Sequence, residues 1–177
     1  MKITGLGPVT PAGIGRTSFA QEINKSTSRI RPITRFGPDT GPFVGAEVTD
    51  FNLADYAPNE NPRRLSRHTQ FSLAAAILAL QDAGLSRDEL KSLNPVVVTG
   101  TSIMDFEKIA RVIELVHDRG PRFMPGSIMY EGSVANVAGK IVQWLDIPMR
   151  MLTLQTSCCS GMDAIGHAFE QVATGQA

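Results

Sequence analysis

The chain has 177 residues, of which 42% are hydrophobic, and its 17 basic residues balance its 17 acidic residues. This length and composition fit one globular domain with a core, or a large part of a bigger protein. A formal net charge of zero gives no field that would draw DNA, RNA or an anionic membrane surface. No apolar run approaches the ~20 residues that span a bilayer, so we expect neither a nucleic-acid partner nor a membrane.

The first 62 residues predict few regular elements. Residues 2–6 are expected to form a short strand, and a Gly- and Pro-rich turn then leads into a helix over 16–25. From 26 to 62 the chain is rich in Pro, Gly, Asp and Asn, which predicts an irregular insertion. Only 43–48 has strand-like alternation there.

The next segment predicts a long helix, a strand and a second helix. The helix over 63–83 is stopped by Gly84, and its second half is apolar on nearly every face, which predicts burial in a core. Residues 94–102 form a continuous β-branched run, typical of an interior parallel strand. An amphipathic helix is expected over 103–118.

The last 45 residues continue the alternation of helices and strands. A helix over 133–144 precedes a strand over 149–156, and a short turn leads into a helix over 162–173. Strands that alternate with helices predict an α/β fold with a mostly parallel sheet.

The positions of the cysteines and histidines indicate the cellular compartment and whether a metal site is expected. The two cysteines, Cys158 and Cys159, are adjacent and cannot form a disulfide framework, which favours the reducing cytoplasm. The three histidines, His68, His117 and His167, are dispersed. They give no spacing typical of metal ligands, so we expect no metal site.

The turn that carries the cysteines is suited to a nucleophile. Cys158 follows a strand and precedes a helix, and in parallel α/β sheets ligands bind at the carboxyl ends of strands. Free N–H groups at a helix start favour a thiolate there and can bind an oxyanion that forms on a thioester carbonyl. The residues alone leave open that Cys158 only packs as a small apolar side chain. Cys159, turned by ~100° on a helix, is expected to point into packing.

No histidine is placed to serve Cys158 as a base. His167 lies nine residues further on, which is more than ~13 Å along a helix axis, whereas a base must lie within about 3 Å. His167 is therefore expected to pack on its helix. His68, at an exposed-looking helix start, and His117, near a helix end, are interpreted as structural.

The cysteine turn resembles the nucleophile motif T-A-C-x-S-G of the β-ketoacyl-acyl carrier protein synthases. Four further stretches agree with this family in order and spacing: 3–13, 63–85, 96–103 and 136–142. The resemblance covers residues 1–177 and is closest to the chain-elongating type. It implies the N-terminal half of a thiolase-like α/β fold, with the irregular insertion at 26–62.

The resemblance also implies an activity and its partners. Cys158 would accept an acyl group from the phosphopantetheine arm of an acyl carrier protein, for decarboxylative condensation with malonyl-carrier protein in fatty acid or polyketide biosynthesis. The Cys158 N–H would form half of the oxyanion hole. Ile103 would line the acyl pocket and Phe123 would close it, although both could be plain core residues. The family needs no cofactor beyond the carrier's arm.

The family's catalytic histidines belong to a second half that these 177 residues do not include. We therefore expect the chain alone to be inactive in condensation and poorly stable, unless a homodimer or a partner chain completes it. Two alternatives remain open. One is a non-catalytic split or degenerate synthase subunit that acts as a binding or dimerisation partner. The other is a different cysteine acyltransferase or hydrolase whose base comes from another chain.

Overall fold

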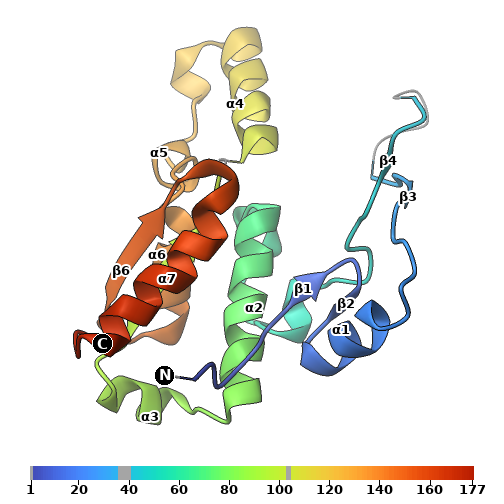
Figure 1. Ribbon diagram of the computed structural model, residues 1–177. Helices are drawn as coiled ribbons and strands as arrows, with labels where there is room; N and C mark the ends of the chain where they lie inside the picture. The colour runs from blue at the N-terminus through green and yellow to red at the C-terminus, as the bar shows by residue number, and fades with distance from the viewer. Residues whose placement is uncertain (1, 36–40, 103–104) are drawn as a thin grey trace. The chain divides into compact units, whose positions relative to one another are not determined.

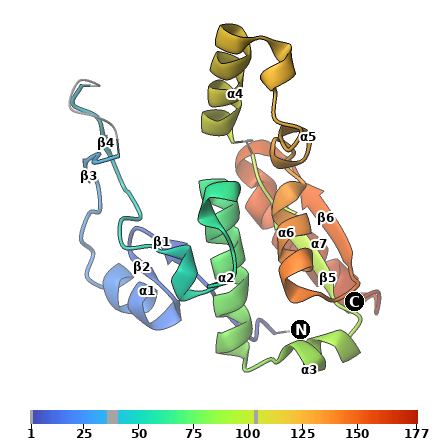
Figure 2. The same cartoon turned by 180° about the vertical axis from the view of Figure 1, so that it is seen from behind.

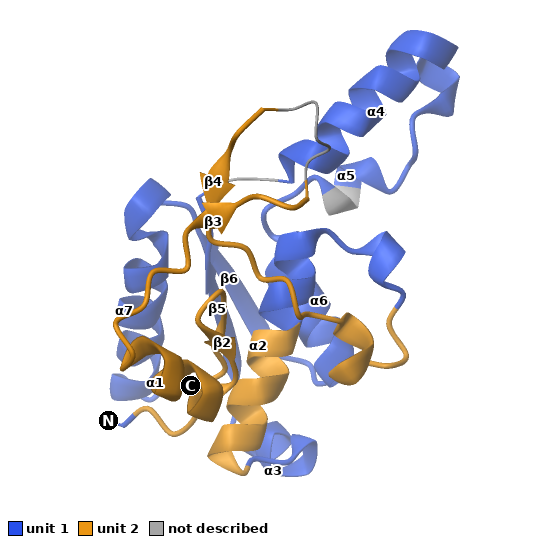
Figure 3. Cartoon of the chain, turned by 90° about the vertical axis from the view of Figure 1, so that its right-hand side faces the viewer, with its two compact units in different colours: residues 1–2, 61–73, 85–177 blue, residues 3–60, 74–84 orange. Residues whose placement is uncertain are grey.

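The computed structural model describes residues 2–35, 41–102 and 105–177. They form two compact units, drawn blue and orange in Figure 3. Unit 1 comprises Met1–Lys2, Asn61–Leu73 and Leu85–Ala177, and unit 2 comprises Ile3–Glu60 and Ala74–Gly84. The long helix α2 (Arg67–Ala83) begins in unit 1 and continues in unit 2.

Two parallel strands form the centre of unit 1. They are β5 (Val96–Gly100) and β6 (Arg150–Leu154), and they pair in register up to Gly100 opposite Leu154. Both strands are rich in β-branched or long apolar residues, which favour the pleated conformation. Because the strands are parallel, their carboxyl ends lie at the same edge of the sheet.

One helix covers each face of this sheet. Helix α7 (Ser160–Ala173) lies in front of the strands in Figure 1, and α6 (Asn136–Leu145) lies in front of them in the reverse view of Figure 2. Unit 1 therefore has the α/β layering that the sequence predicts.

Further helices and single turns complete unit 1. Ser86 and Glu89 form a capping box at the start of the helix over 87–92, which the sequence analysis does not predict. Asp105 caps the next helix by accepting the Lys108 N–H. These helices and single turns are α3 (Arg87–Ser92), α4 (Phe106–Arg119), α5 (Ile128–Glu131), η3 (Pro62–Arg64), η4 (Pro121–Phe123) and η5 (Ser157–Cys159).

Unit 2 contains short strands, single turns and part of α2. Two antiparallel pairs of strands form, and the second pair lies inside the segment 26–62 that the sequence predicts to be irregular. The elements are β1 (Val9–Thr10), β2 (Gly13–Ile14), α1 (Arg16–Ile23), β3 (Arg31–Pro32), β4 (Val44–Gly45) and η2 (Leu53–Asp55).

The strand predicted over residues 2–6 is wrong. A Cβ on Gly5 would lie 2.1 Å from the Ala79 carbonyl oxygen, and one on Gly7 would lie 1.9 Å from that of Ala75. The two glycines therefore bring the backbone directly onto helix α2. The segment packs on a helix, and it pairs with no strand among the described residues.

The other predicted helices and strands are confirmed, with ends that differ by a few residues. On α2, Leu73, Ala74 and Ile77 are at most 4% exposed, while Leu78 and Leu80 are half-buried. One face of this helix is thus fully buried, rather than its whole circumference. Within the described ranges, no helix is both long enough and apolar enough to cross a membrane.

Helix α7 carries apolar side chains on an open face. Met162, Ile165, Phe169 and Val172 recur every three or four residues and are 49–72% exposed. This spacing places them along one side of the helix. Ala164 lies on the opposite side and is buried.

We predict that Gly100→Ala destabilises the protein by about 2 kcal/mol or more. A Cβ at this position would lie 2.1 Å from the Ser160 carbonyl oxygen, so strand β5 and helix α7 would have to separate. Urea unfolding followed by circular dichroism measures the effect.

The matched control is Gly166→Ala, in the middle of α7, where a new Cβ meets nothing within 4 Å. It should be neutral or stabilise the helix by about 0.5–1 kcal/mol, because alanine favours a helix more than glycine does. Equal effects of the two substitutions would contradict this account of Gly100.

Candidate functional site

Cys158 lies in the turn between strand β6 and helix α7. The strand ends at Leu154, η5 contains both cysteines, and α7 begins at Ser160. The Thr101 N–H donates to the Leu154 carbonyl over 3.1 Å, which holds the ends of the two strands together. Cys158 is therefore placed at the carboxyl edge of the parallel sheet, where such sheets bind ligands.

Both cysteines are exposed free thiols. For Cys158, this exposure supports a reactive role over the alternative of a packed apolar residue. For Cys159, the prediction that it points into packing is wrong. Cys159 lies three residues, or about one helical turn, before Met162. It is therefore on the same open side of α7 as Met162, which is 72% exposed.

The hydroxyl of Ser160 joins several parts of the turn. Ser160 is only 2% exposed, and its Oγ lies 2.9 Å from the Thr156 nitrogen, 2.7 Å from the Ser157 carbonyl oxygen and 3.1 Å from the Thr101 carbonyl oxygen. Ser157, the residue before Cys158, has a φ of 55°. This left-handed conformation is unfavourable for any residue except glycine.

The first turn of α7 leaves room for a bound group. A Cβ on Gly161 would meet nothing within 4 Å. Among the described residues, no acceptor is found for the Cys158 N–H. The Asp163 carboxylate accepts a hydrogen bond from the Thr156 hydroxyl, and its charge suits the positive end of the helix. An open helix start with a free N–H can bind a developing oxyanion.

His167 interacts with neighbours on its own helix. Its Nε2 lies 3.4 Å from the Gln171 side-chain nitrogen, and its Nδ1 lies 3.9 Å from a Glu170 carboxylate oxygen. These contacts agree with the interpretation of His167 as a residue of helix α7 rather than a base for Cys158. His117 lies in the last turn of α4 and is exposed.

His68 is more enclosed than the sequence suggests. It is half-buried near the start of α2, and its Nδ1 lies 3.1 Å from the Ser66 hydroxyl. Burial lowers the pKa of His68 below its ordinary value, although the negative charge of Asp105 opposes this change. The prediction of an exposed position is therefore wrong, since the ring is half-buried and contacts Ser66.

The described contacts do not join Phe123, one of the two predicted pocket residues, to Cys158. Ile103 lies outside the described residues. Phe123 ends the turn η4, is 41% exposed, and lies beneath the guanidinium groups of Arg119 and Arg122, at 6.0 and 4.9 Å from its ring centre. Its role in an acyl pocket therefore stays a prediction.

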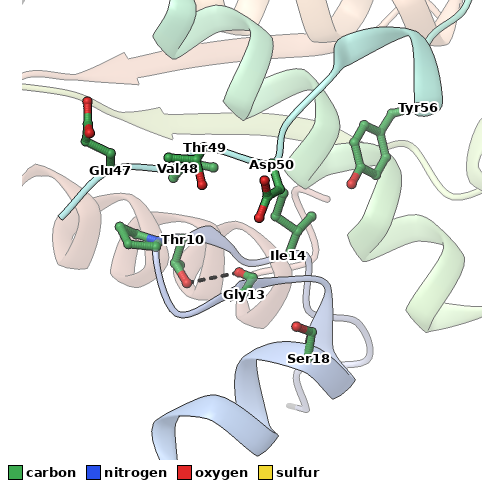
Figure 4. A pocket seen from close by; sticks show the side chains of 10 residues that line it. Thr10, Gly13, Ile14, Ser18, Glu47, Val48, Thr49, Asp50 and Tyr56 are labelled. Carbon is green, nitrogen blue, oxygen red and sulfur yellow. Dashed lines mark hydrogen bonds between the residues drawn. The ribbon is translucent and has the colours of Figure 1, made fainter. Parts of the chain in front are cut away.

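Unit 2 contains a separate cavity of about 280 Å³, which the sequence does not reveal (Figure 4). Glu47 and Asp50 contribute carboxylates to its wall. The Thr34 N–H donates to Glu47 and lowers the pKa of that carboxyl, which burial opposes. The lining residues are Thr10, Pro11, Gly13, Ile14, Ser18, Glu47, Val48, Thr49, Asp50 and Tyr56.

The cavity is polar and offers neither a thiol nor an imidazole. This cavity therefore offers no group for thiol chemistry. Among the described residues, no group of three or more His, Cys, Asp or Glu side chains is arranged to hold a metal ion.

Comparison with known proteins identifies the relatives of the chain. A family model described as the β-ketoacyl synthase N-terminal domain matches residues 1–177. A 3-oxoacyl-[acyl-carrier-protein] synthase 2 from Coxiella burnetii is 30% identical over 97% of this chain and 42% of its own length. A putative polyketide β-ketoacyl synthase 1 from Streptomyces halstedii is 28% identical over 99% of this chain and 43% of its own length. The chain thus spans less than half the length of these relatives.

Solved structures share the fold. The ishigamide ketosynthase/chain length factor superposes with a TM-score of 0.88 and 26% identity, over 98% of this chain and 44% of its own. A β-ketoacyl synthase from Burkholderia phymatum gives a TM-score of 0.78 and 27% identity, over 98% of this chain and 43% of its own. The type II polyketide ketosynthase AntDE, solved with its acyl-carrier protein AntF, gives 0.79 at 22% identity, over 98% of this chain and 47% of its own. The predicted thiolase-like α/β fold is confirmed.

The environment of His68 predicts that acid weakens the fold. Burial lowers the pKa of His68 below 6.5 in the folded protein. As the pH falls, His68 is therefore protonated in the unfolded chain before it is protonated in the folded protein. Stability attributable to neutral His68 is therefore complete above about pH 6.5 and is lost as the pH falls towards the lower folded pKa.

Urea unfolding of the wild type and of His68→Gln, between about pH 7.5 and 5.5, measures this linkage. The wild type should lose more stability on acidification than the variant does. An identical pH dependence in the two proteins would show that His68 is not the group responsible.

Proposed function

The chain belongs to the β-ketoacyl synthase family, whose N-terminal domain it matches over residues 1–177, and on that premise we propose that Cys158 accepts an acyl group as a thioester. One observation carries the proposal. Within the motif-like stretch 156–161, Cys158 is an exposed thiol at the carboxyl edge of the parallel sheet and at the start of α7.

The proposed step is a transfer between two sulfur atoms. The Cys158 thiolate attacks the carbonyl carbon of an acyl thioester, and a bond forms between Sγ and that carbon. The bond to the carrier's sulfur breaks, and its electron pair leaves on that sulfur, which takes a proton from solvent. The Cys158 N–H, which has no acceptor among the described residues, supports an oxyanion site for the intermediate.

Condensation requires more than these residues provide. By the resemblance, decarboxylation of the malonyl group depends on histidines that follow the region matched here. His68 contacts Ser66, the residue before its helix, and His167 contacts Gln171 on its own helix. We propose that this chain by itself proceeds to the acyl-enzyme, and that full β-ketoacyl synthase activity in fatty acid or polyketide synthesis needs the remaining family elements.

The proposed donor is an acyl carrier protein, as in the structural relative solved with its acyl-carrier protein. We further propose a second copy or a partner chain as the cover for the apolar residues Met162, Ile165 and Phe169 on α7. The same exposed face also favours the second candidate function, a non-catalytic synthase subunit that acts through binding. The reducing cytoplasm remains our proposed location.

We predict that Cys158, and not Cys159, is acylated. A short acyl thioester of N-acetylcysteamine stands in for the carrier's arm, and mass spectrometry of the intact protein and its peptides measures the adduct. The wild type and Cys159→Ala should each gain one acyl group, whereas Cys158→Ala should be labelled at least about tenfold more slowly.

Cys159→Ala serves as the matched control, because it removes a neighbouring thiol that is also exposed. Equal labelling of the two cysteines, or unchanged labelling of Cys158→Ala, would reject the nucleophile. A folded wild-type protein that gains no acyl group would favour the non-catalytic subunit.

A further inference from the structure

We propose that Ser160 is a positioning residue whose buried hydroxyl sets the geometry of the turn that presents Cys158. This inference rests on the proposed acylation of Cys158. It assigns a task to a side chain that does not itself react and that lies two residues beyond the nucleophile.

The hydroxyl of Ser160 has one proton and can also accept hydrogen bonds. It accepts from the Thr156 N–H over 2.9 Å. Two carbonyl oxygens compete for its single proton, that of Ser157 at 2.7 Å and that of Thr101 at 3.1 Å. The side chain therefore connects the start of the turn, at Thr156 and Ser157, with Thr101, the residue that follows strand β5.

Ser157 needs such support, because its φ of 55° is unfavourable for a residue with a side chain. Its carbonyl oxygen lies within hydrogen-bond distance of two donors on Ser160, the backbone N–H and the hydroxyl. This φ sets the direction in which the chain leaves Thr156 and enters Cys158. The bonds from Ser160 thus stabilise the backbone conformation from which the thiol projects.

The position of Ser160 is itself fixed by strand β5. Gly100 lies so close that a Cβ there would be 2.1 Å from the Ser160 carbonyl oxygen. Ser160 is also 2% exposed, so bulk water cannot replace its hydroxyl as the partner of Thr156 and Ser157. Loss of the hydroxyl should therefore release the turn, while the cysteine itself remains.

Alkylation of Cys158 by iodoacetamide at neutral pH tests the proposal, with Cys159→Ala as the background in every variant. In Ser160→Ala we expect the rate to fall about tenfold. The reason is that a released turn no longer fixes the direction in which the thiol projects. Ser160→Thr keeps the hydroxyl and should restore most of the rate.

A second substitution separates positioning from general damage to the fold. Glycine adopts a positive φ without strain. Ser157→Gly combined with Ser160→Ala should therefore recover a large part of the alkylation rate. Circular dichroism establishes that the variants are folded, and the double variant decides the question if Ser160→Ala alone is unfolded.

A wild-type alkylation rate in Ser160→Ala would overturn the proposal. So would a slow Ser160→Ala whose rate is restored neither by Ser160→Thr nor by the added Ser157→Gly, because that is the result of a merely structural role. Acylation by the thioester is measured in parallel. If wild-type Cys158 is alkylated but never acylated, the proposed function fails while the positioning role of Ser160 is still decided by the alkylation rates.

Discussion

The close approach of strand β5 to the first turn of helix α7 is the constraint on which unit 1 depends. Gly100 has no side chain, and a Cβ there would be 2.1 Å from the backbone of Ser160. This contact lets Ser160 reach the carbonyl of Thr101, at the end of β5, as well as the turn after β6. The ends of both strands and the start of the helix are therefore held as one group, and Cys158 lies within it.

This arrangement gives different surroundings to the two adjacent cysteines, Cys158 and Cys159. Cys158 follows Ser157, whose left-handed backbone is supported by Ser160, whereas Cys159 already lies in the geometry of the helix that follows. Both thiols are exposed, so access alone does not distinguish them. In our account the distinction comes from backbone direction and from the Cys158 N–H, for which the described residues offer no acceptor, and the acyl transfer at Cys158 is our proposal.

The sequence predicts the central fold because its signals there are local. The β-branched run of β5, the amphipathic pattern of α4 and the small residues around Cys158 each determine structure without distant partners. It fails for residues 2–6, whose packing on α2 depends on glycines meeting a helix far along the chain. The sequence also predicts an exposed His68 and a packed Cys159, and both predictions are wrong. The exposure of each side chain depends on the residues that the fold places around it.

The central claim is that the fold, rather than the local sequence, makes Cys158 the more reactive thiol. The most direct measurement is the ratio of iodoacetamide labelling at Cys158 and Cys159 in the unmodified protein, native and in concentrated urea, by peptide mass spectrometry. We predict a native ratio of about ten or more that falls to about one on unfolding. A native ratio near one, or a high ratio that persists in urea, would contradict the account.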